Sequence, residues 1–371
     1  MAFERVVKVL PKSFERYLSP GRYGLRVARN YVQELLGNQR LVAVDVGAAH
    51  GILPHWHALH GIACIYQIEP RDEACAELGR INAASSHPEF YRVVRAAVAG
   101  TEGPRTLYVS NAPTGTSLFP PDFSAVADAG AYLSEDYFFP IVEQTIETRT
   151  LRSILDELSE ARADLIKLDI QGAELEALQG LGDNYLNELL GGELEIGMTG
   201  IYPEAANFGA CQEFMISRGF DLFDVRVARA HLPYRGQQGA FQTEIFSTYG
   251  NSPTISARIW EFDAVYFRRR SLLLAERNAE KIRRMAVCYL TYNFFAEAFN
   301  LIEGAGELKI FSEAEASHLR KLIVEIHRVR ESRPWLGNNR FWRSMRRIGE
   351  RVAPRSSPRW CQYMYQNYPS G

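Results

Sequence analysis

The stretch from Val42 to Gly51 constrains the fold of this chain more than any other. It begins as an apolar, partly β-branched run, which is typical of a buried strand in a parallel sheet. It continues as Asp45-x-Gly47-x-x-x-Gly51, and Pro54 follows where a helix can begin. Glycines at such a turn let the backbone approach a ligand closely. The stretch therefore predicts a strand, a ligand-binding turn that includes Ala48, and a helix.

The glycines that are present narrow the choice of ligand. A nicotinamide dinucleotide site prefers Gly-x-Gly-x-x-Gly after the strand, and the middle glycine of that pattern is Ala49 here. We therefore favour S-adenosylmethionine, because its ammonium group suits the carboxylate of Asp45. A nucleotide-dependent oxidoreductase is the less favoured alternative.

A second acidic residue ends the next predicted strand. The apolar run 63–69 closes on Glu69, 24 positions after Asp45. A carboxylate at this place can bind both ribose hydroxyls of an adenosine ligand, whereas the alternative is an ordinary solvated glutamate. The strand context favours ligand binding. Ala97, near the end of the following predicted strand, is expected to line the same cofactor site.

Strands and helices alternate from Leu41 onward, which predicts a doubly wound α/β sheet. The predicted strands are 41–46, 63–69, 91–98, 105–110, 164–169, 192–198, 220–227 and 260–268, and the predicted helices are 53–60, 71–83, 150–160, 172–181 and 207–218.

Residues 111–149 interrupt this alternation with prolines, glycine and clustered aromatic residues. A long irregular insertion in a compact domain is more often a functional lid than a linker, although a plain surface loop is the alternative. We expect Thr116 and Ser117 in this insertion, and Tyr202 further along the chain, to bind the acceptor.

Three parts follow from this organisation. Residues 1–40 are expected to form an N-terminal helical cap, 41–270 the catalytic domain, and 271–371 a helical extension with a basic tail.

The tail is rich in arginine: ten arginines lie between positions 328 and 359, against two glutamates. A solvated or partner-facing helix is the favoured interpretation of the tail, and peripheral attachment to an anionic membrane is the second. Nucleic-acid binding is not expected, because no recognised module accompanies the charge.

The segment from Leu165 to Glu174 is the second strong signal. In a strand Lys167 and Asp169 share one face, and a lysine inside a parallel sheet is unfavourable unless it is paired. Asp45 and Glu195, on the predicted neighbouring strands, are the carboxylates that could neutralise it. Asp169 lies at the carboxyl end of its strand, where open α/β sheets bind ligands. Glu174 follows Gly172 at a helix start, where capping and active-site roles are equally expected.

The ordered set VDVGAAHG, IEP, TLRSIL, IKLDIQGAELEALQG and ELEIGMTGIYPEAANF resembles the FkbM-type methyltransferases over roughly residues 41–268. The resemblance implies a class I, Rossmann-like, seven-stranded fold that uses S-adenosylmethionine, usually for O-methylation of a sugar or natural-product hydroxyl. It places Asp45, Gly47, Gly51 and Glu69 in the cofactor site and Asp169 in the later motif. The frequent Asn of the glycine loop is Ala49 here, and the frequent Glu before Gly172 is Gln171.

A hydroxyl acceptor must lose a proton, so a general base is expected near the transferred methyl. Asp169 is the first candidate and His50, inside the cofactor loop, the second; Glu174 is the third catalytic candidate. His50, His55, His57 and His60 lie close in sequence, but their helical spacing does not gather a ligand set, so no metal is expected. The alternative from another class is a noncatalytic scaffold that keeps the cofactor fold.

Composition indicates the compartment. Five dispersed cysteines contain no CxxC pair, which favours a reducing cytoplasm. Residues 1–30 hold no long apolar run, so no signal peptide is predicted, and no run approaches the ~18 apolar residues of a membrane span. We expect a cytoplasmic enzyme with a small-molecule or glycan acceptor, or one held at the inner face of the membrane by its tail. The sequence does not specify the oligomeric state.

Overall fold

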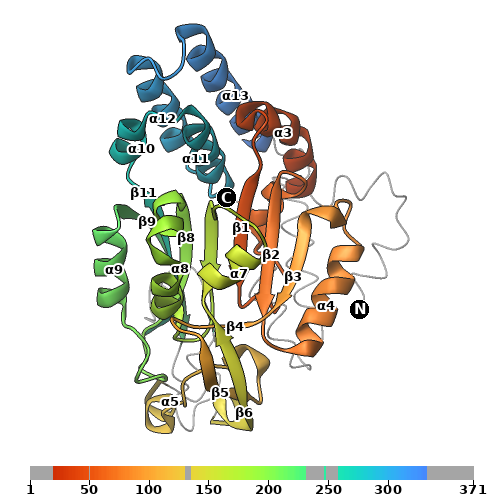
Figure 1. Ribbon diagram of the computed structural model, residues 1–371, viewed down its shortest axis with the longest axis vertical. Coiled ribbons are helices and arrows are strands. Elements are labelled where there is room, and N and C mark those ends of the chain that lie inside the picture. The colour runs from red at the N-terminus through yellow and green to blue at the C-terminus, as the bar shows by residue number, and fades with distance from the viewer. Residues whose placement is uncertain (1–19, 50, 130–134, 231–245, 248–257, 332–371) are drawn as a thin grey trace, which may run out of the picture. The chain divides into compact units, whose positions relative to one another are not determined.

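The computed structural model describes residues 20–49, 51–129, 135–230, 246–247 and 258–331 (Figure 1). Contacts divide the chain into two compact units. One holds residues 41–51 and the described parts of 63–275, and the other holds the described parts of 1–40, 52–62 and 276–371. The three-part division expected from the sequence stays a prediction.

The larger unit is built on an eight-stranded sheet with the order β10-β9-β11-β8-β7-β1-β2-β3. β11 runs antiparallel to β8 and β9, whereas β3, β2, β1, β7 and β8 are mutually parallel. The expected seven strands are present, and the two-residue β10 adds an eighth. The bounds are β1 Leu41–Val46, β2 Ala63–Glu69, β3 Tyr91–Arg95, β7 Leu165–Leu168, β8 Gly191–Gly197, β9 Phe220–Ala230, β10 Phe246–Ser247 and β11 Arg258–Arg268.

Helices cover both faces of this sheet, as the alternation of elements predicts. On one face Val44, Ile166 and Leu194 belong to an apolar core with residues of α7, α8 and α9. On the other face Gln67 of β2 accepts a hydrogen bond of 2.7 Å from Asn82 of α4. The bounds are α4 Asp72–Ala83, α7 Leu151–Glu157, α8 Glu174–Glu188 and α9 Phe208–Ser217; a short helix, η2 Pro88–Phe90, precedes β3, and α10 Arg270–Glu276 follows β11.

A second sheet of three strands, ordered β4-β6-β5, follows β3 in the chain. Its strands are β4 Ala97–Val98, β5 Gly103–Ser110 and β6 Pro140–Arg149, with η3 Pro113–Gly115, α5 Phe123–Ala129 and α6 Glu135–Phe138 between the last two. Three expectations are therefore wrong. The single strand 91–98 splits between two sheets, the strand near 105–110 does not join the main sheet, and residues 140–149 are a strand rather than irregular. The antiparallel pairing of β5 and β6 was not predicted because the two strands lie far apart in the sequence.

The other unit is helical. Its elements are α3 Pro20–Leu36, η1 Pro54–Leu59, α11 Ala279–Thr291, α12 Phe295–Glu307 and α13 Glu313–Glu331. Trp56 Nε1 donates to the hydroxyl of Tyr292 over 3.0 Å, and Arg283 donates to the carbonyl of Leu35 over 2.9 Å. The predicted helix 53–60 is a six-residue 3-10 helix, Pro54–Leu59, rather than an α-helix.

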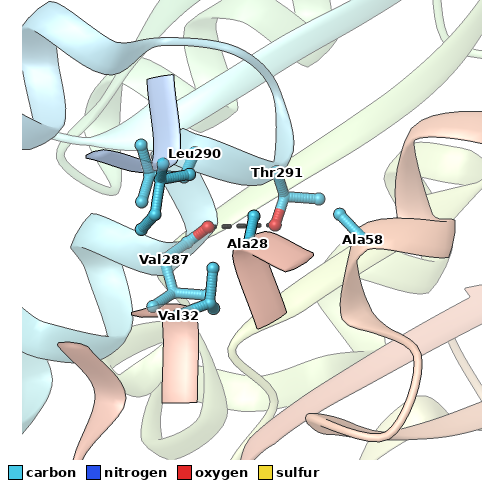
Figure 2. Close-up of a pocket in the computed structure, with 7 residues that line it drawn as sticks. Ala28, Val32, Ala58, Val287, Leu290 and Thr291 are labelled. Atoms are coloured by element: carbon cyan, nitrogen blue, oxygen red, sulfur yellow. Dashed lines mark hydrogen bonds between the residues drawn. The ribbon is translucent and has the colours of Figure 1, made fainter. Parts of the chain in front are cut away.

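A small cavity in this unit is lined almost wholly by apolar side chains, as Figure 2 shows. Thr291 contributes a hydroxyl, which donates to the carbonyl of Val287 one turn back in α11. The cavity therefore offers packing space and no chemistry. Its lining residues are Ala28, Val32, Ala58, Val287, Leu290, Thr291 and Ile326.

The arginine-rich stretch begins in the last residues of α13, but its part from 332 onward lies outside the described residues, and so does His50. Among the described helices, none is long and apolar enough to cross a membrane.

Candidate functional site

The carboxyl end of β1 forms the first part of the site. Asp45 is fully buried, and neither of its oxygens has a hydrogen-bond partner among the described residues. The nearest cation, Lys167 Nζ, is 3.5 Å from Oδ1. Burial raises the pKa of Asp45 to about 6, against the opposing effect of Lys167. A buried carboxylate in this state favours a cationic ligand group.

The turn after β1 is fixed by its neighbours on both sides. The N–H groups of Gly47 and Ala48 donate to the carbonyl of Ile68 over 3.0 and 3.3 Å. The carbonyl of Val46 accepts from the N–H of Asp169 over 3.1 Å. Gly47 has a φ of +80°, and a Cβ there would lie 1.8 Å from the carbonyl oxygen of Asp169. Glycine is therefore required where the turn passes the end of β7.

Glu69 ends β2 and is 3% exposed. Its Oε1 accepts from the backbone N–H and the Nε of Arg71, at 3.2 and 2.7 Å. These bonds hold the carboxylate at the strand end, and its binding of a ribose stays a prediction. Ala97 is buried in the small sheet, and the N–H of the preceding Ala96 donates to the carbonyl of Glu69. The chain thus brings Glu69 and Ala97 to the same edge.

Lys167 of β7 links two of the predicted site carboxylates. Its Nζ is 3.0 Å from Asp169 Oδ2 and 3.5 Å from Asp45 Oδ1, and the side chain is 8% exposed. Burial alone would lower the pKa of Lys167, but the charges of Asp169 and Asp45 outweigh it and raise the pKa above its ordinary value. Of the two partners expected from the sequence, Asp45 is present, whereas the second described ion pair of Lys167 goes to Asp169 and not to Glu195. Lys167 is therefore a charged core residue that fixes the two acids at adjacent strand ends.

A second link runs from β7 to β8. Gln171 Nε2 donates to Asp169 Oδ1 over 3.3 Å and to Glu195 Oε2 over 2.6 Å. Gln171 is not a glycine, yet it has a φ of +55°. The strained conformation turns its side chain back across the strand ends. The residue that departs from the family pattern thus bridges two carboxylates, and sequence reasoning assigned it no site role.

Glu174 stabilises the turn that follows β7 by accepting hydrogen bonds from its backbone. Its carboxylate accepts from the N–H of Ile170 over 2.9 Å and from the N–H of Gly172 over 3.0 Å. Burial raises the pKa of Glu174 to about 7, although these backbone donors lower it. All of its described hydrogen bonds go to backbone, which fits the capping interpretation. A catalytic role for Glu174 stays a prediction.

Two of the predicted acceptor residues take part in packing. Ser117 Oγ donates to the carbonyl of Gln171 over 2.7 Å, and the hydroxyl of Tyr202 donates to the carbonyl of Gly115 over 2.8 Å. These bonds tie the insertion to the turn after β7 and to the segment after β8. Thr116 Oγ1 is buried and has no hydrogen-bond partner among the described residues. Of the three predicted acceptor residues, Thr116 is therefore the one whose hydroxyl forms no hydrogen bond with a described residue.

His50, the second candidate for the base, lies outside the described residues. Among the residues that the structure does describe, no group of three or more His, Cys, Asp or Glu side chains is placed to hold a metal ion.

The site as a whole is acidic and lies at a reversal of strand order. β1 is followed along the chain by β2 on one side and paired with β7 on the other, and such a switch point is where open α/β sheets bind ligands. Asp45, Glu69, Asp169 and Glu195 all lie at this edge, and their described cationic partners are Lys167 and Arg71. The unsatisfied Asp45 carboxylate and the close-packed Gly47 fit a cofactor that carries an ammonium and a sulfonium charge.

The order β3-β2-β1-β7-β8-β11-β9, with β11 antiparallel, together with this edge defines a class I methyltransferase fold. Residues 45–222 match the family model described as the methyltransferase FkbM domain. The chain carries this domain and is an S-adenosylmethionine-dependent methyltransferase, which confirms the family, fold and cofactor predicted from the sequence. No curated protein is similar enough to count as a match.

Solved structures give only distant likenesses. A precorrin-6y C5,15-methyltransferase from Geobacter metallireducens has 12% identity, a TM-score of 0.30, and coverage of 66% of this chain and 88% of its own. A putative RNA methyltransferase from Pyrococcus horikoshii has 11% identity, a TM-score of 0.28, and coverage of 64% and 84%. An uncharacterised protein from Listeria monocytogenes has 12% identity, a TM-score of 0.29, and coverage of 81% and 97%. Likenesses this distant do not bear on the acceptor.

Proposed function

We propose that this methyltransferase transfers the methyl group to a hydroxyl oxygen of a sugar, polysaccharide or natural product. The observation that supports the proposal is the carboxylate network at the ends of β7 and β8, where Gln171 joins Asp169 to Glu195. A hydroxyl is a weak nucleophile until its proton is removed, and a carboxylate pair beside the cofactor site can remove it. An acceptor atom that is nucleophilic without losing a proton would not need a base at this position.

In this proposal the residues divide into two groups. Asp45, Gly47, Ala48, Gly51, Glu69 and Ala97 hold the cofactor, which supplies an electrophilic methyl group when bound. Asp169 lies at the end of β7, between the cofactor edge and β8, where it orients the acceptor and the cofactor. Thr116 can donate to or accept from an acceptor hydroxyl. The main contribution of the chain is to align the acceptor oxygen with the methyl group and to exclude water.

The acceptor class is tested by incubating the full chain with S-adenosylmethionine labelled in its methyl group. The panel holds nucleotide sugars, free sugars, a bacterial polysaccharide extract, and an RNA as the contrasting acceptor. We expect label on a sugar oxygen, located by mass spectrometry. Label found only on RNA, or cofactor binding with no transfer to any member of the panel, would count against a sugar acceptor.

Replacing Glu69 by alanine should weaken binding of S-adenosylmethionine by about 1.5–3 kcal/mol, because charge-assisted hydrogen bonds to the ribose are lost. Isothermal calorimetry on the full chain measures this directly. Glu73→Ala is the matched control, since Glu73 is exposed in the first turn of α4 and lies only four residues away. Equal affinity of the Glu69→Ala variant and the unaltered chain would remove Glu69 from the cofactor site.

We propose a small-molecule or glycan partner and no nucleic-acid partner. Peripheral contact of the basic tail with an anionic membrane or with another protein stays a prediction, as does a cytoplasmic location.

A further inference from the structure

Two carboxylates at the edge of the sheet compete for the role of base, and their surroundings differ. Both oxygens of Asp169 are already engaged: Lys167 Nζ lies 3.0 Å from Oδ2, and Gln171 Nε2 lies 3.3 Å from Oδ1. An ammonium beside a carboxylate stabilises its ionised form and weakens it as a proton acceptor. Asp169 is therefore held in place as an anion rather than prepared to take up a proton.

Among the described residues no ion pair joins Glu195 to a cation, although the charge of Lys167 also acts on it. It lies near the carboxyl end of β8, on the same face as Glu193, and its Oε2 is fixed by Gln171 Nε2 at 2.6 Å. Its register partner on β11 is Asp263, and Glu261 lies opposite the following glycine. Glu195 is only partly buried, whereas Glu193 is 1% exposed and is paired with Arg226 at 3.5 Å. Of the two glutamates on this strand, Glu195 is the one that an acceptor can reach.

The strand order indicates where an acceptor could bind. The cofactor residues occupy the ends of β1 and β2, on one side of the switch point. The ends of β7 and β8 remain for the acceptor on the other side, and these ends carry Asp169 and Glu195.

We propose that Glu195 is the catalytic residue that accepts the proton of the acceptor hydroxyl, and that Asp169 and Gln171 are positioning residues. The acceptor O–H bond breaks and its proton passes to the Glu195 carboxylate. The oxygen forms a bond to the methyl carbon, and the carbon–sulfur pair returns to sulfur, which becomes a neutral thioether. The inference rests on the proposed hydroxyl acceptor.

The acid–base properties of the two groups agree with this assignment. Burial, followed by the negative charges of Asp169 and Glu261, raises the pKa of Glu195 well above its ordinary value. Burial also opposes ionisation of Asp169, but Lys167 outweighs it and the pKa of Asp169 is lowered. The raised pKa of Glu195 and the lowered pKa of Asp169 make Glu195 the more basic of the two carboxylates. Other ionisable groups facing it are Asp263, Lys167 and the phenol of Tyr202.

The first test needs no acceptor. Infrared titration of the full chain, with and without S-adenosylmethionine, follows carboxyl protonation in the unaltered chain, Glu195→Gln, Asp169→Asn and the control Glu193→Gln. We expect a carboxyl that titrates far above ordinary glutamate and disappears in Glu195→Gln. In Asp169→Asn it should move to lower pH, because a neighbouring negative charge is gone. A Glu195 carboxyl that titrates below Asp169 overturns the assignment.

The second test uses whichever sugar the labelled panel identifies, in single-turnover methyl transfer across pH. The rate should rise with pH as Glu195 ionises. Glu195→Gln should abolish this rise and lower the rate about 10²–10⁴-fold, the usual reach of general-base catalysis. Asp169→Asn should shift the rise to lower pH, and Glu193→Gln should retain it. If Asp169→Asn removes the rise while Glu195→Gln keeps it, Asp169 is the base. A panel without any methylated sugar counts against the proposed function, and the infrared titration still decides the role of Glu195.

Discussion

Replacing Lys167 by methionine should lower the free energy of unfolding by about 3–5 kcal/mol, the usual cost of removing one partner from a buried ion pair. The side chain of Lys167 is 8% exposed and lies within 3.5 Å of two carboxylates, Asp45 and Asp169. Methionine has a similar volume, so the loss reports on charge rather than on a cavity. Thermal or denaturant unfolding near neutral pH measures it.

The pH dependence of this loss provides a stricter test. The raised pKa of Lys167 means that its stabilising charge is fully present at neutral pH and is lost only in strongly alkaline solution. Without it, Asp45 and Asp169 should have higher pKa values, so acid should neutralise them and restore part of the stability. We therefore expect the difference between the Lys167→Met variant and the unaltered chain to shrink from pH 8 to pH 5.

Lys281→Met is the matched control. Lys281 is 2% exposed, but its partner Glu276, at 2.8 Å, keeps 37% of its side chain exposed and can be hydrated when the lysine is lost. Its loss should be smaller and should depend little on pH between 5 and 8. Equal losses for the two variants, with no recovery in acid, would mean that Asp45 and Asp169 are not held ionised by Lys167.

The main sheet was predictable because its signals are local. The run at residues 41–46 is fully buried in the structure, and the alternation of strands and helices places β1, β2, β7 and β8 within about two residues of their predicted bounds. The small sheet was not predictable in this way. β5 and β6 pair across a 29-residue connection, from 111 to 139, that contains helices of its own. Nothing in the alternation of residues 140–149 reveals which partner they pair with.

For the site, the spacing of the motifs predicted which edge of the sheet holds it. The residue types alone did not decide which carboxylate has which role. Asp45, Glu69 and Asp169 were expected at strand ends and lie there. The pairing of Lys167 follows from the cost of burying a lone cation. The bridge from Gln171 to Glu195 depends on a residue with positive φ, which a sequence does not disclose for glutamine. The sequence did contain one indication of a role for Glu195, the alternation Glu193-Leu194-Glu195 within a buried strand. Two acidic side chains on one face of an inner strand are unfavourable unless they have partners or a function.

Replacing Gly47 by alanine should lower the free energy of unfolding by about 2–5 kcal/mol, from overpacking and from backbone strain together. The added Cβ would lie 1.8 Å from the carbonyl oxygen of Asp169, and that oxygen belongs to backbone that cannot swing aside. The turn must move away from β7, which also displaces the N–H groups of Gly47 and Ala48 from the carbonyl of Ile68. Binding of S-adenosylmethionine should weaken in parallel, which calorimetry measures.

Gly51→Ala separates the two causes, because it lies in the same turn and shares the strain without the overlap. Its φ is +87°, close to the +80° of Gly47, but a Cβ there meets no described atom within 4 Å. The variant should lose only about 1–2 kcal/mol, the cost of placing an L-residue in a left-handed conformation. The difference between the two variants then measures how tightly the turn is packed against the end of β7. Equal losses would place the turn farther from Asp169 and would separate the cofactor loop from the residues that orient the acceptor.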